Sequence, residues 1–174
     1  GTYKEMVEVM DEGIGRIMQT LQELNLDRNT FVFFCSDNGA RFGSNGSLRG
    51  AKGSLWEGGH RVPTIARFPG KIEQGVVTDA TIMSMDLVPT LLNIAGVETT
   101  TGFDGKDFSG VLFNNNELPE RPLFWRYRNQ WSVRKGNWKY LKVKEEEYLF
   151  NLEQDVSEQE NLFTENPEKA RELK

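Results

Sequence analysis

The chain has 174 residues, which is enough for one domain with a proper core or for a large domain piece with a small appendage. Its formal net charge of -5 argues against general affinity for nucleic acid or anionic membranes, because no basic surplus neutralises phosphates. A single cysteine excludes an intramolecular disulfide framework, and no apolar run approaches the roughly 20 residues that span a bilayer. Any anion recognised by this chain must therefore be recognised locally.

The N-terminal segment has the order helix, turn, strand. Apolar residues recur every three or four positions from Tyr3 to about Asn25, which predicts a helix packed on another element. A coiled coil is the rival interpretation, but glycines interrupt the pattern. Residues 30–35 form a β-prone run that is apolar on both faces, as in a strand buried in a parallel sheet. This order predicts an α/β fold, and Cys35 at the end of the run is interpreted as an inert, buried thiol.

The later segments predict further strands and helices. A strand is expected over residues 64–68, and a helix over residues 86–96, which has an acidic start, an early proline and a closing glycine. From Leu123 onward, short aromatic-rich segments separated by turns predict a four-stranded antiparallel sheet, followed by a polar helix from about Pro167. The four expected strands are residues 123–127, 131–134, 138–143 and 148–152.

The texture of the sequence changes at a polar, proline-containing linker over residues 114–122. We therefore expect two domains. Residues 1–118 would form an α/β portion, and residues 119–174 would form a small α+β subdomain.

Polar residues with metal-binding chemistry follow the first predicted strand directly. Ligands bind at the carboxyl ends of strands in open α/β sheets, and Ser36, Asp37 and Asn38 lie at such an end. Asp37 and Asn38 each offer a hard oxygen, which suits Ca²⁺ or Mg²⁺. Two oxygens do not complete a cation site, so the rest would come from other segments, water or a bound anion. The alternative is that Asp-Asn-Gly is simply a tight turn.

The glycine-rich loop that follows carries candidate anion ligands. Lys52 lies between two glycines, and its ammonium group could hold one oxygen of a sulfate or phosphate. Arg49 is a second candidate, and for both residues the alternative is a solvated side chain. His60 is the only histidine, and it is interpreted as a packed structural residue in preference to a general acid. Glu57 is interpreted as tying the loop down through backbone N–H groups or Arg61.

An ordered set of motifs resembles the sulfatases of the alkaline-phosphatase superfamily, of the arylsulfatase type. The motifs are "MDEGIGRIMQTLQELNLDRNT", "SDNG", "RGAKGSLWEGGHRVP", "ARFPG", "MDLVPTLLNIAG", "FDGKDFSGVL", "VRKGNWKYL" and "YLFNLEQDVSEQENL", which occur in family order over nearly the whole chain. The resemblance implies the C-terminal part of an alkaline-phosphatase-like sheet-and-helix domain, followed by a small four-stranded antiparallel sheet with a C-terminal helix.

The resemblance also implies roles for individual residues. Asp37 and Asn38 would be ligands of a Ca²⁺ ion, with Mg²⁺ as the other candidate, and Lys52 would be a catalytic residue that contacts the sulfate. Arg49 and His60 remain further candidates for substrate binding, and no catalytic role is transferred to His60. The implied reaction hydrolyses a sulfate ester of a small molecule or glycan to an alcohol and inorganic sulfate.

One departure from the family pattern is large. The formylglycine nucleophile of sulfatases arises from a C-x-P-S-R or S-x-P-S-R motif, and neither motif occurs here. The chain is therefore expected to be the C-terminal part of a sulfatase, with the N-terminal remainder of the same polypeptide as its partner. Alone it is expected to lack turnover and to bind cations weakly. Family resemblance suggests a periplasmic, extracellular or lysosome-like location.

Two other function classes remain open. A phosphoesterase or phosphonate hydrolase of the same superfamily would share much of this sequence but use a different nucleophile. A non-catalytic module that binds an anion or a metal is the second alternative. The residue that acts as nucleophile decides among the three classes.

Overall fold

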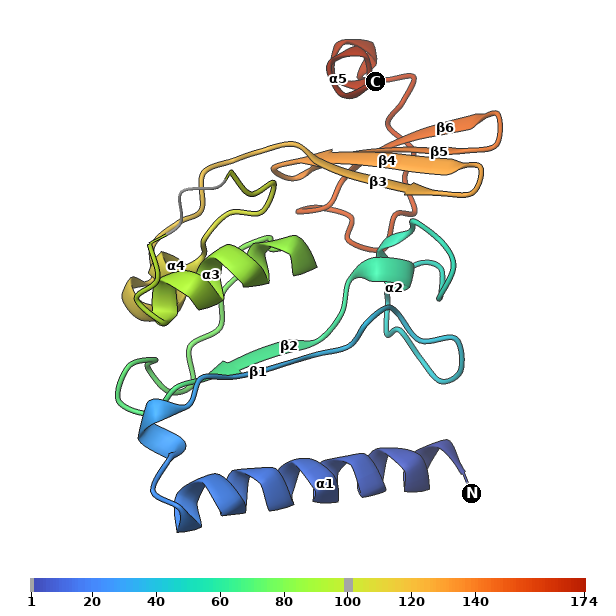
Figure 1. Ribbon diagram of the computed structural model, residues 1–174. Coiled ribbons are helices and arrows are strands. Elements are labelled where there is room, and N and C mark those ends of the chain that lie inside the picture. Colours follow the sequence, from blue (N-terminus) through green and yellow to red (C-terminus); the bar gives the residue numbers. More distant parts are fainter. Residues whose placement is uncertain (1, 99–101) are drawn as a thin grey trace. The chain divides into compact units, whose positions relative to one another are not determined.

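A computed structural model describes residues 2–98 and 102–174 (Figure 1). The elements in chain order are α1 (Tyr3–Glu23), a 3-10 helix (Asp27–Asn29), β1 (Val32–Cys35), α2 (Glu57–His60), β2 (Thr64–Arg67), a second 3-10 helix (Ser84–Asp86), α3 (Leu87–Ile94), α4 (Ser109–Asn114), β3 (Leu123–Tyr127), β4 (Gln130–Lys135), β5 (Trp138–Val143), β6 (Glu146–Asn151) and α5 (Pro167–Leu173). The predicted α/β class, with its four-stranded antiparallel sheet and C-terminal helix, is confirmed.

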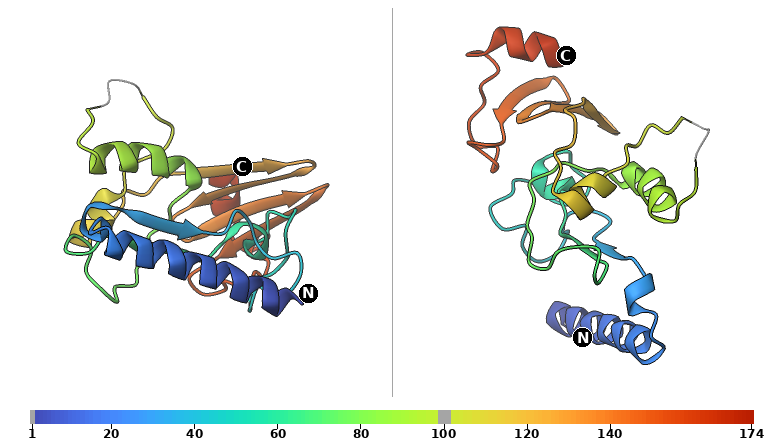
Figure 2. Two further views of the ribbon diagram at one scale, coloured as in Figure 1. Left: turned by 60° about the horizontal axis from the view of Figure 1, so that its bottom comes forward. Right: turned by 90° about the vertical axis from the view of Figure 1, so that its left-hand side faces the viewer.

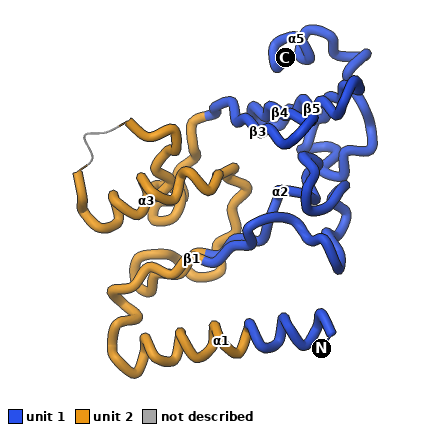
Figure 3. Tube along the Cα trace, turned by 45° about the vertical axis from the view of Figure 1, so that its right-hand side comes forward, with its two compact units in different colours: residues 1–10, 34–65, 120–174 blue, residues 11–33, 66–119 orange. Residues whose placement is uncertain are grey.

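Contacts within the chain define two compact units, coloured separately in Figure 3. The first unit comprises residues 1–10, 34–65 and 120–174, and the second comprises residues 11–33 and 66–119. The predicted division into domains 1–118 and 119–174 stays a prediction, because the two units group segments by contact and do not test independent folding.

The sheet of the first unit is a meander in the order β3-β4-β5-β6, and all its neighbours are antiparallel. Its three connections each contain a residue with positive φ: Arg128 at 54°, Gly136 at 57° and Lys144 at 55°. Left-handed residues are typical of tight hairpin connections, because they match the twist of the flanking strands. The short loops therefore fix the register of all four strands.

One face of this sheet is covered by α5, as Figures 1 and 2 show. Pro167 begins the helix, where its missing N–H costs nothing. Ala170 and Leu173 of the helix form a buried core with Tyr140 and Leu149 of the sheet. Burial of a leucine side chain contributes about 1.5–3 kcal/mol, so this core accounts for the docking of the C-terminal helix.

The other face of the sheet receives the glycine-rich loop. Side chains alternate between faces along a strand, so Lys139 lies on the face opposite Tyr140. On this face Gln130 Oε1 accepts the backbone N–H of Leu55 at 3.0 Å. The ring of Trp56 lies against that of Phe150, with centroids 5.7 Å apart. The antiparallel sheet therefore has α5 on one side and the glycine-rich loop on the other.

The second unit is organised around aromatic side chains and a buried carboxylate. Phe68 and Phe108 are its buried rings, and Phe33 lies 6.3 Å from Phe108. Asp86, which is fully buried, accepts the backbone N–H of Met83 at 2.7 Å and that of Lys106 at 2.8 Å. The acidic residue expected to start the helix over residues 86–96 thus ties the helix start to a distant loop.

Two expectations about burial are wrong. β1 was expected to be a buried strand with a buried cysteine, but Cys35 is exposed and the rest of β1 is half-buried. Among the described residues β1 has a single sheet neighbour, β2, so the run that is apolar on both faces is not enclosed. α1 forms as predicted, yet none of its residues is buried. No helix in the described ranges is long and apolar enough to cross a membrane.

Candidate functional site

Three residues predicted to form the site lie together just beyond β1. Asp37 and Asn38 follow the strand directly, and the Asn38 amide Nδ2 donates a close hydrogen bond to Asp37 Oδ2. Lys52 Nζ lies 4.0 Å from the same carboxylate oxygen. The side chains of Lys52 and Asp37 are 52% and 82% exposed, so both are accessible to a ligand from solvent. The structure therefore brings an ammonium group beside a carboxylate and an amide at the end of a strand.

The glycines around this site allow backbone segments to touch. The N–H of Gly39 donates to the carbonyl of Gly59 at 2.9 Å, and a Cβ on Gly39 would overlap the carbonyl oxygen of Gly58. The N–H of Lys52 donates to the carbonyl of Ala40 at 3.3 Å. The backbone of Lys52 is thus tied to the segment that leaves β1.

Arg49 is engaged with the protein itself. Its guanidinium lies over the ring of Trp56, with Cζ 3.8 Å from the ring centroid. Its Nη1 donates to the backbone carbonyl of Glu158 at 2.8 Å. These contacts anchor the start of the glycine-rich segment, and the predicted contact of Arg49 with substrate stays a prediction.

His60 is packed among side chains of the same unit. Its Nε2 lies 3.2 Å from Glu57 Oε1 and 3.3 Å from Lys139 Nζ, and its ring meets Trp125 edge-on at 4.8 Å. Burial is the main influence on its pKa and lowers it, although the hydrogen bond to Glu57 acts in the opposite direction. A lowered pKa keeps the imidazole neutral at pH 7. These contacts agree with the structural interpretation, while substrate binding by His60 stays a prediction.

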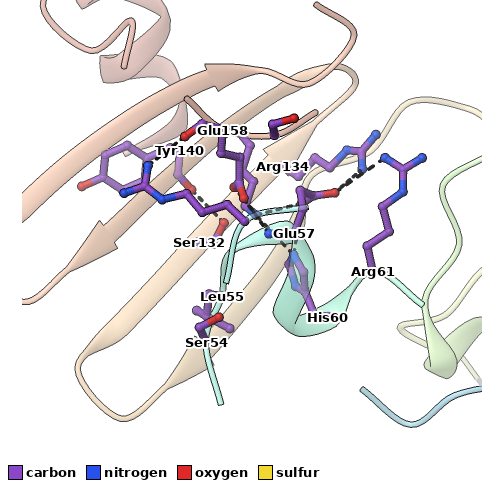
Figure 4. Close-up of polar contacts among 12 residues, drawn as sticks. Ser54, Leu55, Glu57, His60, Arg61, Ser132, Arg134, Tyr140 and Glu158 are labelled. Atoms are coloured by element: carbon purple, nitrogen blue, oxygen red, sulfur yellow. Dashed lines mark hydrogen bonds and ion pairs between the residues drawn. The ribbon is translucent and has the colours of Figure 1, made fainter. Parts of the chain in front are cut away.

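A buried ionic cluster, formed by Glu57, Lys139 and Glu158, lies beside His60, and Figure 4 shows its two carboxylates. Lys139 Nζ is 2.8 Å from Glu57 Oε1 and 2.8 Å from Glu158 Oε1. Arg134 and Arg61 each place an Nη1 atom 3.8 Å from Glu57 Oε2. Glu57 therefore lies among several cationic side chains.

The two carboxylates of this cluster differ in pKa. Burial alone would raise the pKa of Glu57, but the hydrogen bond from His60 and the charge of Lys139 lower it to about 2. Burial raises the pKa of Glu158, and the charge of Lys139 offsets this only in part. Glu57 is therefore the firmly ionised partner of Lys139.

Part of this cluster is predictable from the sequence. Glu57 was expected to pair with backbone N–H groups or with Arg61; the contact with Arg61 is present, and the structure adds Lys139 as the closest cation. Lys139 and Glu158 were missed. Lys139 is flanked by Trp138 and Tyr140 in one of the predicted strands, and this is an available signal, because a charge between large aromatic side chains is buried only with a partner.

The donor atoms at Asp37 and Asn38 fit a hard cation in kind but not in number. Carboxylate and amide oxygens are the ligands that Ca²⁺ and Mg²⁺ prefer, and Ca²⁺ takes roughly six to eight of them. Within residues 2–98 and 102–174, no group of three or more His, Cys, Asp or Glu side chains could hold a metal ion. A cation at Asp37 and Asn38 would therefore need further ligands from other residues, water or a bound anion.

Two family models match the chain. The model described as "Sulfatase" matches residues 1–97, and the model described as "N-sulphoglucosamine sulphohydrolase, C-terminal" matches residues 51–173. Together they cover all the elements described above, including the site beyond β1 and the sheet β3–β6.

Curated relatives point the same way. The chain is 38% identical over 142 residues to the steryl-sulfatase of Mus musculus, covering 74% of this chain and 23% of the relative. It is 40% identical over 134 residues to the N-acetylgalactosamine-6-sulfatase of Sus scrofa, covering 72% and 26%. A sulfatase of Formosa agariphila is 33% identical over 197 residues, with 95% of this chain and 36% of the relative covered. The chain thus spans about a quarter to a third of the length of these relatives.

Solved structures agree with the sequence matches. The crystal structure of Ps i-CgsB in complex with k-i-k-neocarrahexaose superposes with a TM-score of 0.92 at 31% identity, covering 98% of this chain and 40% of that one. The structure of BT4656 with its substrate D-glucosamine-2-N,6-O-disulfate gives a TM-score of 0.79 at 25% identity, covering 96% and 37%. On the match of its residues 1–97 alone, which is more than half of its length, the chain belongs to the sulfatase family.

Proposed function

We propose that the protein hydrolyses sulfate esters to an alcohol and inorganic sulfate, and that this chain contributes Lys52, Asp37 and Asn38 to the reaction. The observation that carries the proposal is the position of Lys52, whose Nζ lies 4.0 Å from Asp37 at the exposed end of β1. Membership of the sulfatase family supports the reaction type. The activity is proposed for the whole protein, because this chain spans only about a quarter to a third of the length of its relatives.

The chemistry of each residue follows from its charge and exposure. The Lys52 ammonium is a compact point charge that would hold an oxygen of the sulfuryl group and stabilise negative charge as it develops. Asp37 and Asn38 would contribute oxygens to a Ca²⁺ site, with Mg²⁺ as the other candidate. A cation bound there would supply further positive charge beside the sulfate oxygens, and the nucleophile, a formylglycine by family resemblance, would come from outside this chain.

The substrate that we propose is a sulfated carbohydrate. Two structures that resemble this chain were solved with saccharides, one with k-i-k-neocarrahexaose and the other with D-glucosamine-2-N,6-O-disulfate, described as its substrate. An aryl or steryl sulfate is the competing class, because the steryl-sulfatase of Mus musculus is also a relative. The two classes are separated by testing both kinds of ester on the same preparation.

The experiment compares the whole protein that contains this chain, as its gene encodes it, with its Lys52→Ala variant. Sulfate release from a sulfated disaccharide is expected to fall by about a hundredfold or more when the electrostatic contact is lost. Lys4→Ala is the matched control, since Lys4 is an exposed lysine on α1 and its side chain is 82% exposed. Unchanged sulfate release by Lys52→Ala, with activity present in the wild type, would contradict the assigned role.

A further inference from the structure

The segment that carries Lys52 is a closed loop held at both ends by one residue. The N–H of Gly58 donates to the carbonyl of Arg49 at 2.7 Å, which closes the base of the loop. Arg49 Nη1 donates to the backbone carbonyl of Glu158 at 2.8 Å, and the N–H of Glu57 donates to Glu158 Oε2 at 2.7 Å. Glu158 therefore accepts hydrogen bonds from Arg49, which precedes Lys52, and from Glu57, which follows it.

Glu158 is itself held in an unusual state. Its side chain is fully buried, and its Oε1 lies 2.8 Å from Lys139 Nζ. Its backbone has φ of 54°, a left-handed conformation that residues other than glycine adopt infrequently. Such a conformation persists only where the surroundings over-determine it, and such residues cluster at functional sites. The turn hydrogen bond from the Glu158 N–H to the carbonyl of Asp155 at 3.2 Å provides part of that constraint, and the contacts to Arg49, Glu57 and Lys139 provide the rest.

Lys52 depends on this arrangement because its own side chain is weakly fixed. The side chain is half exposed, and its ionic contact with Asp37 is long, at 4.0 Å. Its placement therefore comes from the backbone of the loop, through the hydrogen bond from its N–H to Ala40 and the closed base at Arg49 and Gly58.

We propose that Glu158, held by Lys139, is a positioning residue that sets the place of Lys52 beside Asp37. The inference rests on the proposed function, in which Lys52 contacts the sulfate. Glu158 touches no reacting group and acts through the loop of residues 49–58. A misplacement of about 1 Å in a reacting group costs on the order of a hundredfold in rate, so a residue that shifts Lys52 through this loop would change the reaction without touching the sulfate.

Two variants in the encoded protein separate the parts of this role. Glu158→Gln keeps the shape and an acceptor for the Glu57 N–H but removes the charge that faces Lys139. Glu158→Gly removes the side-chain contacts with the Glu57 N–H and with Lys139. Glycine adopts the left-handed backbone conformation without strain, so a loss of function cannot be assigned to backbone strain. Glu160→Gln is the matched control, because Glu160 is an exposed glutamate two residues along the same segment.

The first measurement is amide hydrogen exchange, which does not depend on activity. In Glu158→Gly, the amides of residues 52–58 are expected to exchange at least tenfold faster, while those of β3–β6 keep their protection. Glu158→Gln is expected to give a smaller change of the same pattern, and Glu160→Gln none. Unchanged exchange at residues 52–58 in a folded Glu158→Gly protein would overturn the proposal. If Glu158→Gly does not fold, wild-type exchange at these residues in Glu158→Gln overturns it.

The second measurement is the inhibition constant of inorganic sulfate against the hydrolysis of a sulfated disaccharide. The constant is expected to rise about tenfold in Glu158→Gln and more in Glu158→Gly, because Lys52 no longer holds the anion in place. Faster loop exchange with an unchanged constant would overturn the link from Glu158 to Lys52. A wild-type protein that hydrolyses no sulfate ester would instead refute the proposed function, and the exchange data would still decide whether Glu158 holds the loop.

Discussion

Replacement of Lys139 by methionine tests the buried ionic cluster most severely. The Lys139 side chain is fully buried, and its Nζ lies 2.8 Å from an oxygen of both Glu57 and Glu158. Lys139→Met has a similar shape but leaves both carboxylates buried without that cation. Removing one partner of a buried ion pair costs about 3–5 kcal/mol, against a total stability of about 5–15 kcal/mol for a typical domain. The variant should therefore lose a large share of its stability.

Thermal denaturation followed by tryptophan fluorescence measures this loss. A chain of 150–250 residues loses about 2–4 °C of Tm per kcal/mol, so Lys139→Met should melt on the order of 10 °C below wild type. Lys135→Met is the matched control from the same sheet, because Lys135 forms an exposed ion pair with Glu172 at 2.8 Å. If the two variants lose the same stability, the reasoning about the buried cluster is refuted.

Three smaller perturbations have expected outcomes of their own. Gly59→Ala places a Cβ onto the carbonyl oxygen of Ser54 and should lower the Tm, whereas Gly13→Ala, with open space in α1, should stabilise by about 1 kcal/mol; equal melting curves would contradict this. The pKa of His60 in the folded protein lies below its ordinary value of 6.5, because burial favours the neutral imidazole. The folded state therefore loses stability as the pH falls below 6.5. Urea titrations at pH 7 and pH 5 should therefore show a larger loss in wild type than in His60→Asn, and parallel losses would exclude this assignment. The pKa of Glu57, lowered from 4.5 to about 2, contributes stability that is present above pH 4.5 and lost towards pH 2; acid titration of Glu57→Gln should show a shallower loss, and a wild-type slope would count against it.

Local sequence patterns predicted most of the fold. The three- and four-residue spacing of α1, the aromatic segments of β3–β6 and the proline that begins α5 are each encoded within a short stretch of chain. α4 was missed because its six residues, 109–114, are too few to show a helical period. The burial of β1 was overestimated, because an apolar run predicts that a strand can be buried on both faces but does not show how many strands or helices pack against it.

The candidate site also has a part that local sequence patterns predict and a part that they do not. Asp37, Asn38 and Lys52 lie within sixteen residues of one another, and their sequence context alone was enough to nominate them. The pairing of Glu57 with Lys139 and Glu158 was not predictable, because Lys139 lies 82 positions from Glu57 and Glu158 lies 101 positions from it. The docking of the loop on the sheet decides which lysine and glutamate side chains pair across such distances.

The most direct test of the central claim is the identity of the anion that the encoded protein releases. Purified protein would be incubated with a sulfated disaccharide and with the corresponding phosphorylated disaccharide, and the inorganic anions quantified by ion chromatography. The account predicts stoichiometric release of sulfate, lost on chelation of divalent cations and restored by Ca²⁺, with far slower release of phosphate. Preferential release of phosphate, or release of neither anion by a folded, Ca²⁺-supplied protein, would contradict it.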